Sequence, residues 1–177
     1  KSSVENTIMA VPKTSKDSIA EAKRNWEKHG WPEAASGMAT VTNVIRVAQL
    51  LRQQAEAILV PFGISFSRYE LLALLMFSRS GALPMSKAST RLHVPPASIT
   101  HTVGRLEKEG LVQRIPDPND GRGTLVAITD QGITLINTAT PALNAFFQDF
   151  GLDKTDRDQL FALCNKLRLN YGDAVEN

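Results

Sequence analysis

Residues 95–129 read PPASITHTVGRLEKEGLVQRIPDPNDGRGTLVAIT, and the spacing of their apolar residues changes at Gly110. Before that glycine, Ile99, Val103 and Leu106 recur at steps of four and three, which places them on one face of a helix. Prolines suit the first turn of a helix, where a missing N–H needs no partner, so the two leading prolines mark its start. The sequence therefore predicts a helix that ends just before the glycine.

A hairpin is predicted directly after this helix. Residues 111–115 and 124–128 are short runs of the length and composition typical of strands. The residues between them, 116–123, read PDPNDGRG and are dense in turn formers. The sequence therefore predicts two strands joined by a polar, extended tip.

Upstream of this stretch, the sequence predicts a long amphipathic helix that ends near Pro61. Its apolar positions are Val41, Val44, Ile45, Ala48, Leu51, Ala55, Ile58 and Leu59. A capping box, in which two side chains satisfy each other's backbone N–H groups, opens a second helix at Ser67. After a short extended segment, Ser86 is predicted to cap a helix over 87–92, and a tight turn follows.

Helices are also predicted toward both ends of the chain. One covers residues 129–150, and a last one begins at Asp153 or Thr155. Near the N-terminus, a capping box at Ser18 opens a short helix, and residues 31–37 are interpreted as a linker.

The order helix, helix, short strand, helix, tight turn, helix and hairpin is that of a winged helix-turn-helix domain. A helix about 10–12 Å across fits the major groove of B-DNA, and the hairpin reaches the neighbouring minor groove. Small polar residues on the outer face of the helix after Pro95 allow close approach to base edges. The residues of this face are Pro96, Ala97, Ser98, Thr100, His101, Thr102 and Arg105. The alternative is an ordinary surface helix with a solvated polar side.

The tip of the hairpin favours DNA binding. Arg122 lies between Gly121 and Gly123, and an arginine on a thin tip can enter a narrow, electronegative minor groove. Asp120 is predicted to hold this arginine in position. The alternatives are an exposed loop arginine for Arg122 and a simple turn former for Asp120.

The distribution of charge points the same way. The whole chain of 177 residues has an ordinary globular composition, with 42% hydrophobic residues, and a net charge of only +2. Residues 79–122 carry seven Lys/Arg against four Asp/Glu, whereas residues 123–177 carry four against seven. A basic middle followed by an acidic tail indicates a DNA-facing body with a separate C-terminal role, and chance is the alternative.

This part of the chain resembles the MarR family of transcriptional regulators. The resemblance is carried by SIT at 98–100, RLEKEGLVQR at 105–114 and DPNDGRGTLVAIT at 117–129, and it covers about residues 40–172. It implies a homodimer joined by the first long helix and the last two helices. It also implies binding to a pseudo-palindromic operator, usually as a repressor.

The resemblance also assigns roles to single residues. Arg122 matches the wing arginine of the family, and Asp120 matches the acidic residue before it. His101 and Gly104 stand where the family often has arginine and aspartate, so the resemblance does not carry over the base preference.

The predicted fold is mainly α with a small β-hairpin wing: a winged helix-turn-helix domain plus a helical dimerisation region. Residues 1–37 are expected to form an N-terminal arm and a short extra helix, which lie outside the common core of the family. Residues 38–62 are the first dimerisation helix, 63–129 the DNA-binding domain and 130–177 the C-terminal dimerisation helices.

Two-fold symmetry predicts two recognition helices in successive major grooves, about 10 base pairs apart. The recognition helix is the one predicted after Pro95, and the helix over 87–92 braces it. Ser86, at the start of the bracing helix, and Gly121, at the tip of the hairpin, are also expected to contact DNA. The candidates for phosphate contacts are Lys87, Arg91, Arg105 and Arg114. Arg105 could also read a guanine with two hydrogen bonds.

Members of the family often release DNA when a small aromatic or phenolic ligand binds between the dimer helices and the winged domain. Tyr69, Met76 and Phe77 are candidates to line such a cavity, with Arg46 as the partner of an anion. The alternative is that Tyr69, Met76 and Phe77 belong to the core and that Arg46 is a solvated helix residue.

Other functions have little support in the sequence. It has no arrangement of nucleophile and base, no phosphate loop and no metal motif, so we expect no enzyme activity, cofactor or metal. Its one cysteine, Cys164, is expected to pack against neighbouring residues of the last helix. A cytoplasmic location is expected because the chain has one cysteine, no apolar run as long as a membrane span and no secretion signal. A winged helix that binds a protein partner instead of DNA is the rival interpretation.

Overall fold

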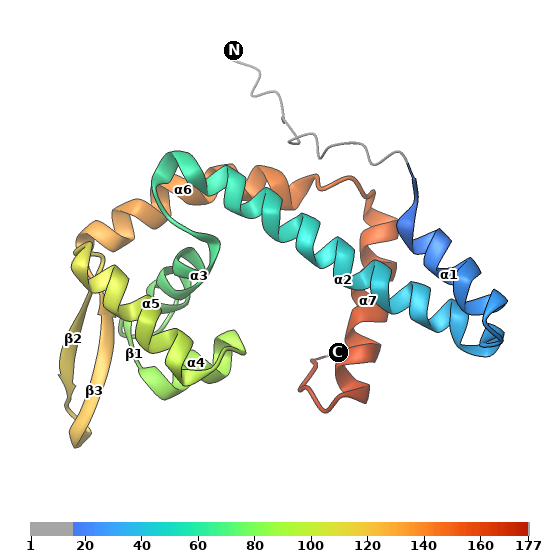
Figure 1. Ribbon diagram of the computed structural model, residues 1–177. Coiled ribbons are helices and arrows are strands. Elements are labelled where there is room, and N and C mark those ends of the chain that lie inside the picture. The colour runs from blue at the N-terminus through green and yellow to red at the C-terminus, as the bar shows by residue number, and fades with distance from the viewer. Residues whose placement is uncertain (1–15, 177) are drawn as a thin grey trace, which may run out of the picture. The chain divides into compact units, whose positions relative to one another are not determined.

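The computed structural model describes residues 16–176 (Figure 1). Most of the predicted N-terminal arm, residues 1–15, lies outside the described residues. The described part is mainly helical with one small sheet, as the sequence predicts. In chain order the elements are α1 (Ser18–Lys28), α2 (Pro32–Leu59), a 3-10 turn η1 (Val60–Phe62), α3 (Phe66–Met76), β1 (Ala82–Pro84), α4 (Met85–Leu92), α5 (Pro96–Lys108), β2 (Val112–Asp117), β3 (Asp120–Ile128), α6 (Asp130–Gln148) and α7 (Lys154–Asn170).

The chain divides into two compact units, one up to Leu143 and one from Asn144 onward. In the first unit, the sheet has the order β1-β3-β2 and is antiparallel throughout. Arg114 of β2 pairs with Val126 of β3, and Ala82 of β1 pairs with Ala127 on the other edge. The hairpin β2–β3 is longer than predicted and projects beyond the helices of its unit, as Figure 1 shows.

The core of the first unit is built from residues of α2, α3, α5, α6 and the sheet. Every apolar residue of the predicted inner face of α5 is buried, with Val103 and Leu106 fully inaccessible. The other large residues that are fully enclosed are Leu59, Leu71, Leu72, Leu75, Val126, Ile136 and Leu143. This core fixes which side of α5 faces outward.

The segment 31–37 is not a linker, because α2 already begins at Pro32. Proline favours the first turn of a helix, and the alanines that follow have high helix propensity. The sequence prediction missed this start because small residues carry no apolar period. α1 packs against α2, and the rings of Trp26 and Trp31 meet edge to face at 5.6 Å where the two helices join.

Three predicted helix caps are wrong by one or two residues. Asp17, rather than Ser18, caps α1 and accepts hydrogen bonds from two backbone N–H groups at 3.1 and 3.0 Å. Ser65, rather than Ser67, caps α3. α4 starts without a side-chain cap, so Ser86 lies inside its first turn. Asp153 caps α7, which is one of the two predicted starts.

No single helix of residues 16–176 has the length and apolar content to cross a membrane; α2 with η1 and α3 meet the criterion only together, and they are bent by 78°.

Candidate nucleic-acid interface

Helix α5, the predicted recognition helix, follows a tight turn at the end of α4. His93 adopts a left-handed backbone conformation with φ of 53°, which ends α4 abruptly. The Ser89 hydroxyl donates a 2.6 Å hydrogen bond to the carbonyl oxygen of Val94 and so closes the turn. Pro95 and Pro96 then start α5, as predicted. The turn fixes the angle between the bracing helix and the recognition helix.

The outward face of α5 lies opposite Ile99, Val103 and Leu106. Its exposed side chains include the predicted residues Ala97, Ser98, His101 and Arg105, and also Lys108, which the prediction did not include. A side chain at Gly104 would meet nothing within 4 Å, so this face is open to a ligand. The small side chains of this face allow close approach to a DNA groove, and His101 and Arg105 beside them can form hydrogen bonds there.

Two residues on α5 that are predicted to contact DNA have part of their hydrogen-bonding capacity in use. The hydroxyl of Thr100 donates to the carbonyl of Pro96 at 3.0 Å, and that of Thr102 donates to the carbonyl of Ser98 at 2.8 Å. In this conformation each hydroxyl can accept from a DNA donor but cannot donate to an acceptor. Arg105, by contrast, has no side-chain partner among the described residues, and its guanidinium is exposed.

At the tip of the wing, Asp120 holds Arg122 through the backbone and not through its side chain. The Asp120 carboxylate accepts a 3.1 Å hydrogen bond from the backbone N–H of Arg122. Asp117 does the same for Asn119 at 2.9 Å, so both carboxylates shape the backbone of the turn. The Arg122 side chain is exposed and has no partner within residues 16–176. A Cβ at Gly123 would lie 3.1 Å from that of Asp117, so a side chain there would force its neighbours to shift slightly.

Ion pairs fasten the C-terminal end of α5 to its neighbours. Glu107 pairs with Arg114 of β2 at 2.6 Å, and Glu109 pairs with Arg68 at the start of α3. Arg114 must therefore share its charge between Glu107 and any phosphate, which weakens its predicted role as a phosphate contact. The two pairs link the recognition helix, the wing and α3.

α4 offers a separate basic surface. Lys87 and Arg91 lie one helical turn apart, are exposed, and line an open hollow together with Ser86 and Thr90. The Thr90 hydroxyl donates to the Ser86 carbonyl at 3.1 Å. Two cations at this spacing can follow the phosphates on one side of a groove.

Comparison with known proteins identifies the family. The model of the MarR family matches residues 66–124, which cover α3 through the wing. The crystal structure of Sco5413, a MarR family transcriptional regulator from Streptomyces coelicolor, is 42% identical and has a TM-score of 0.72, and the match covers 80% of this chain and 99% of that one. The chain belongs to the MarR family.

Two further structures of MarR-type regulators are similar to this chain. Sco3205 from Streptomyces coelicolor, solved in complex with DNA, is 26% identical over 79% of this chain and 90% of its own, with a TM-score of 0.71. CouR from Rhodococcus jostii RHA1, solved bound to p-coumaroyl-CoA, is 25% identical over 75% of this chain and 92% of its own, with a TM-score of 0.63. MarR family proteins are DNA-binding transcriptional regulators and not enzymes.

The four residues predicted to line an effector cavity have different environments. Tyr69 is only 8% exposed, and its hydroxyl lies 2.6 Å from that of Thr140. Phe77 is 77% exposed at the end of α3, whereas Met76 and Arg46 are partly buried. Tyr69 therefore fits the alternative interpretation as a core residue, and Phe77 does not.

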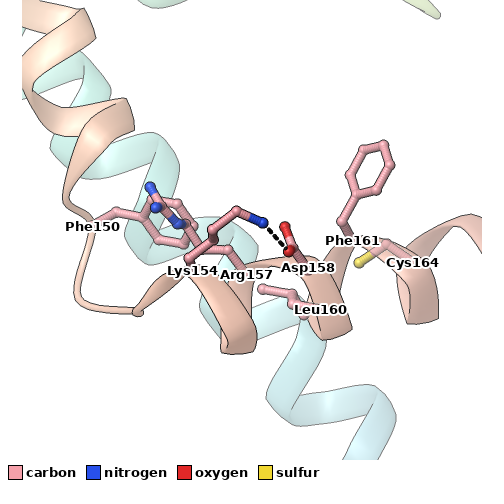
Figure 2. Close-up of a pocket in the computed structure, with 7 residues that line it drawn as sticks. All are labelled: Phe150, Lys154, Arg157, Asp158, Leu160, Phe161 and Cys164. Atoms are coloured by element: carbon pink, nitrogen blue, oxygen red, sulfur yellow. Dashed lines mark hydrogen bonds and ion pairs between the residues drawn. The ribbon is translucent and has the colours of Figure 1, made fainter.

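The second unit has a pocket of its own at the start of α7, with a volume of about 570 Å³ (Figure 2). Its charged groups are already paired: Lys154 contacts Asp158 at 2.6 Å, and Arg157 donates to the Gln148 carbonyl at 2.8 Å. Cys164 lines this pocket and is exposed, so its predicted place in packing is wrong for the single chain. The rest of the lining is mostly apolar, which suits a protein surface better than a polar ligand.

In a MarR regulator, a side chain that touches a phosphate displaces counterions from the DNA. We expect Lys87→Ala to weaken binding to every DNA sequence alike, because the amine of Lys87 is predicted to contact the phosphate backbone and no base. The slope of log affinity against log salt concentration should fall by about one unit for each phosphate contact that the substitution removes. Fluorescence anisotropy over a salt series measures the slope, with the exposed Lys16→Ala as the matched control. An unchanged slope would remove Lys87 from the interface.

The carboxyl group of Glu70 on α3 has a raised pKa. Burial raises the pKa of this carboxyl above its usual value, Arg52 acts in the opposite direction, and Glu56 raises it further. Because the folded protein binds this proton more tightly than the unfolded chain, stability is lost as the pH rises from the ordinary pKa through the folded one.

We therefore expect Glu70→Gln, which cannot ionise, to be more stable than the wild type at pH 7. The stability difference between Glu70→Gln and the wild type should shrink at about pH 4. At that pH, more of the wild-type carboxyl is protonated in both the folded and the unfolded protein than at pH 7. Urea unfolding at the two pH values measures the difference. If the two proteins differ in stability by the same amount at both pH values, ionisation of Glu70 does not affect stability.

Proposed function

We propose that this MarR protein is a repressor that binds a pseudo-palindromic operator as a homodimer. One α5 helix would enter each of two successive major grooves, and Arg122 of each wing would enter the adjoining minor groove. The observation that carries the proposal is the outward face of α5, where Arg105 and His101 are exposed beside small residues, within the same unit as the unpaired Arg122.

Exposed apolar surface supports the homodimer. On α2, Val41, Val44 and Ile45 are 60%, 50% and 54% exposed in the single chain, and they lie on one side of the helix. α7 has no buried residue, although its apolar side chains are numerous: Leu160, Phe161, Leu163, Leu167 and Leu169. Apolar patches of this kind on a soluble chain mark an interface. A second copy of the chain is the partner that the proposal assigns to both helices.

Repression follows from the size of such a complex. A dimer that spans two successive major grooves covers about 20 base pairs or more, and an operator that overlaps a promoter would exclude the polymerase. The basic residues of α4 would add affinity that does not depend on sequence.

The proposal includes release by a small aromatic effector. CouR, a relative of 25% identity, was solved bound to p-coumaroyl-CoA, and Arg46, Tyr69, Met76 and Phe77 remain our candidates for contact with an aromatic molecule. The protein has one conformation that fits the operator and another that fits it poorly. An effector can release DNA only if it binds the poorly fitting conformation more tightly. Tyr69 would have to exchange its contact with Thr140 for one with the ligand.

Footprinting on the DNA upstream of the protein's own gene tests the proposal. We expect protection of an inverted repeat, a shifted band in gel electrophoresis, and a weaker shift with Arg122→Ala. Arg24→Ala is the matched control, because Arg24 is exposed on α1 and has no side-chain partner among the described residues. Absence of any shift at low salt would favour the rival function, a winged helix that binds a protein.

Sedimentation equilibrium in the absence of DNA tests the dimer separately. A monomer at micromolar concentration would contradict the assignment of α2 and α7 to an interface, whatever the DNA result.

A further inference from the structure

A pocket of about 400 Å³ lies along one flank of the recognition helix. It is formed within the first unit by the beginning of α3, the turn between α4 and α5, and α5 itself. Leu92, Val94 and Ile99 give it an apolar floor, and Ser67, Glu70 and His101 contribute polar groups. An apolar hollow of this size with a few converging polar groups has the character of a small-molecule site.

Glu70 is the only residue of this lining with a full charge at neutral pH. Its carboxylate has no hydrogen bond or ion pair with any residue that the structure describes, and it is partly buried. Burial raises the pKa of this carboxyl, and Arg52 of α2 lowers it without lining the pocket. A partly desolvated carboxylate without a hydrogen bond or ion pair gains from a ligand that brings a positive charge and N–H donors.

The pocket shares residues with the proposed DNA surface. Ser98, His101 and Thr102 line it, and all three are residues that we expect to contact DNA. The Thr102 hydroxyl already donates to the Ser98 carbonyl at 2.8 Å, so it can only accept from a ligand. A molecule in the pocket would therefore lie against the side of α5 that has to enter the major groove.

We propose that this pocket binds a small organic cation, an ammonium or amidinium group on an aromatic or aliphatic body, and that its occupancy excludes DNA. The cationic group donates to the Glu70 carboxylate, and the hydroxyls of Ser67 and Thr102 accept its remaining N–H groups. The apolar body covers Leu92 and Val94. An anion is disfavoured, because the formal charge of the lining is negative. The second half of the proposal rests on the proposed DNA-binding function.

The test uses the full chain with benzylammonium and benzamidinium as probes, and benzyl alcohol and benzoate as uncharged and anionic controls of the same shape. Isothermal calorimetry without DNA measures binding to the wild type, to Glu70→Gln and to Glu33→Gln. Glu33 is exposed in the first turn of α2, outside the pocket, and is the matched control. We expect at least one cation to bind, the control compounds not to bind, and only Glu70→Gln to lose about tenfold or more in affinity.

A second arm measures displacement of a fluorescent duplex at constant ionic strength. The cation should release DNA from the wild type, and the same concentration should not release it from Glu70→Gln. The proposal is overturned if neither cation binds, if Glu70→Gln binds equally well, or if bound cation and DNA coexist. If the chain binds no DNA at any salt concentration, the proposed function fails, while calorimetry still decides whether the pocket takes a cation.

Discussion

Arg105→Ala is expected to lower affinity for the operator by about 1–3 kcal/mol for each half-site and to relax the choice of base at one position. Arg105 lies in the last turn of α5, is exposed, and has no partner among the described residues. A guanidinium that is already free need not break an ion pair before it donates two hydrogen bonds to a guanine edge. Arg114, by contrast, forms an ion pair with Glu107 at 2.6 Å, which it would have to weaken before it could bind DNA.

The measurement compares the operator found by footprinting with a scrambled duplex of the same length. Arg105→Lys is the matched variant, because it keeps the charge and loses the paired hydrogen-bond geometry. We expect Arg105→Lys to keep most of the affinity for scrambled DNA and to lose selectivity. If Arg105→Ala weakens both duplexes by the same factor, Arg105 contacts a phosphate and not a base.

The elements that carry the site could be predicted because they rest on strong local signals. The change of apolar spacing at Gly110 separates α5 from β2, and the proline pair fixes where α5 begins. The start of α2 had no such signal, since its first turns are small residues without an apolar period. The capping residues were also mispredicted because the local sequence did not distinguish between candidates. Asp17 stands directly beside Ser18, and either residue type can cap a helix, so only geometry decides.

The orientation of the DNA-binding face was predictable, but the state of its side chains was not. Burial of Ile99, Val103 and Leu106 on one side leaves His101 and Arg105 on the other, and helical spacing alone gives that result. The bonds of Thr100 and Thr102 to their own helix depend on rotamers, and the pair between Glu107 and Arg114 joins two different elements. The spacing of residues in the sequence predicts neither these hydrogen bonds nor this ion pair.

Sequence analysis also missed Gly132, which the structure places at the junction of the sheet and α6. A Cβ at this position would lie 2.7 Å from Cγ1 of Ile128 and inside van der Waals contact with the carbonyl oxygen of Leu111. That carbonyl already accepts from the backbone N–H of Thr129 at 3.1 Å, and the Thr129 hydroxyl donates to the Gly110 carbonyl at 2.7 Å. The backbone on both sides of the contact is therefore fixed.

Gly132→Ala should lower the free energy of unfolding by about 1–3 kcal/mol or more, because the added methyl group meets backbone that cannot move aside. Gly104→Ala is the matched control: it makes the same change within a helix where nothing lies within 4 Å of the new Cβ. Alanine is favoured over glycine inside a helix by about 1 kcal/mol, so Gly104→Ala should be as stable as the wild type or more stable. Urea unfolding of both variants measures the contrast. If both substitutions stabilise, the first turn of α6 has room to move away from β2, and the wing is less firmly attached to α6 than the close contact at Leu111 implies.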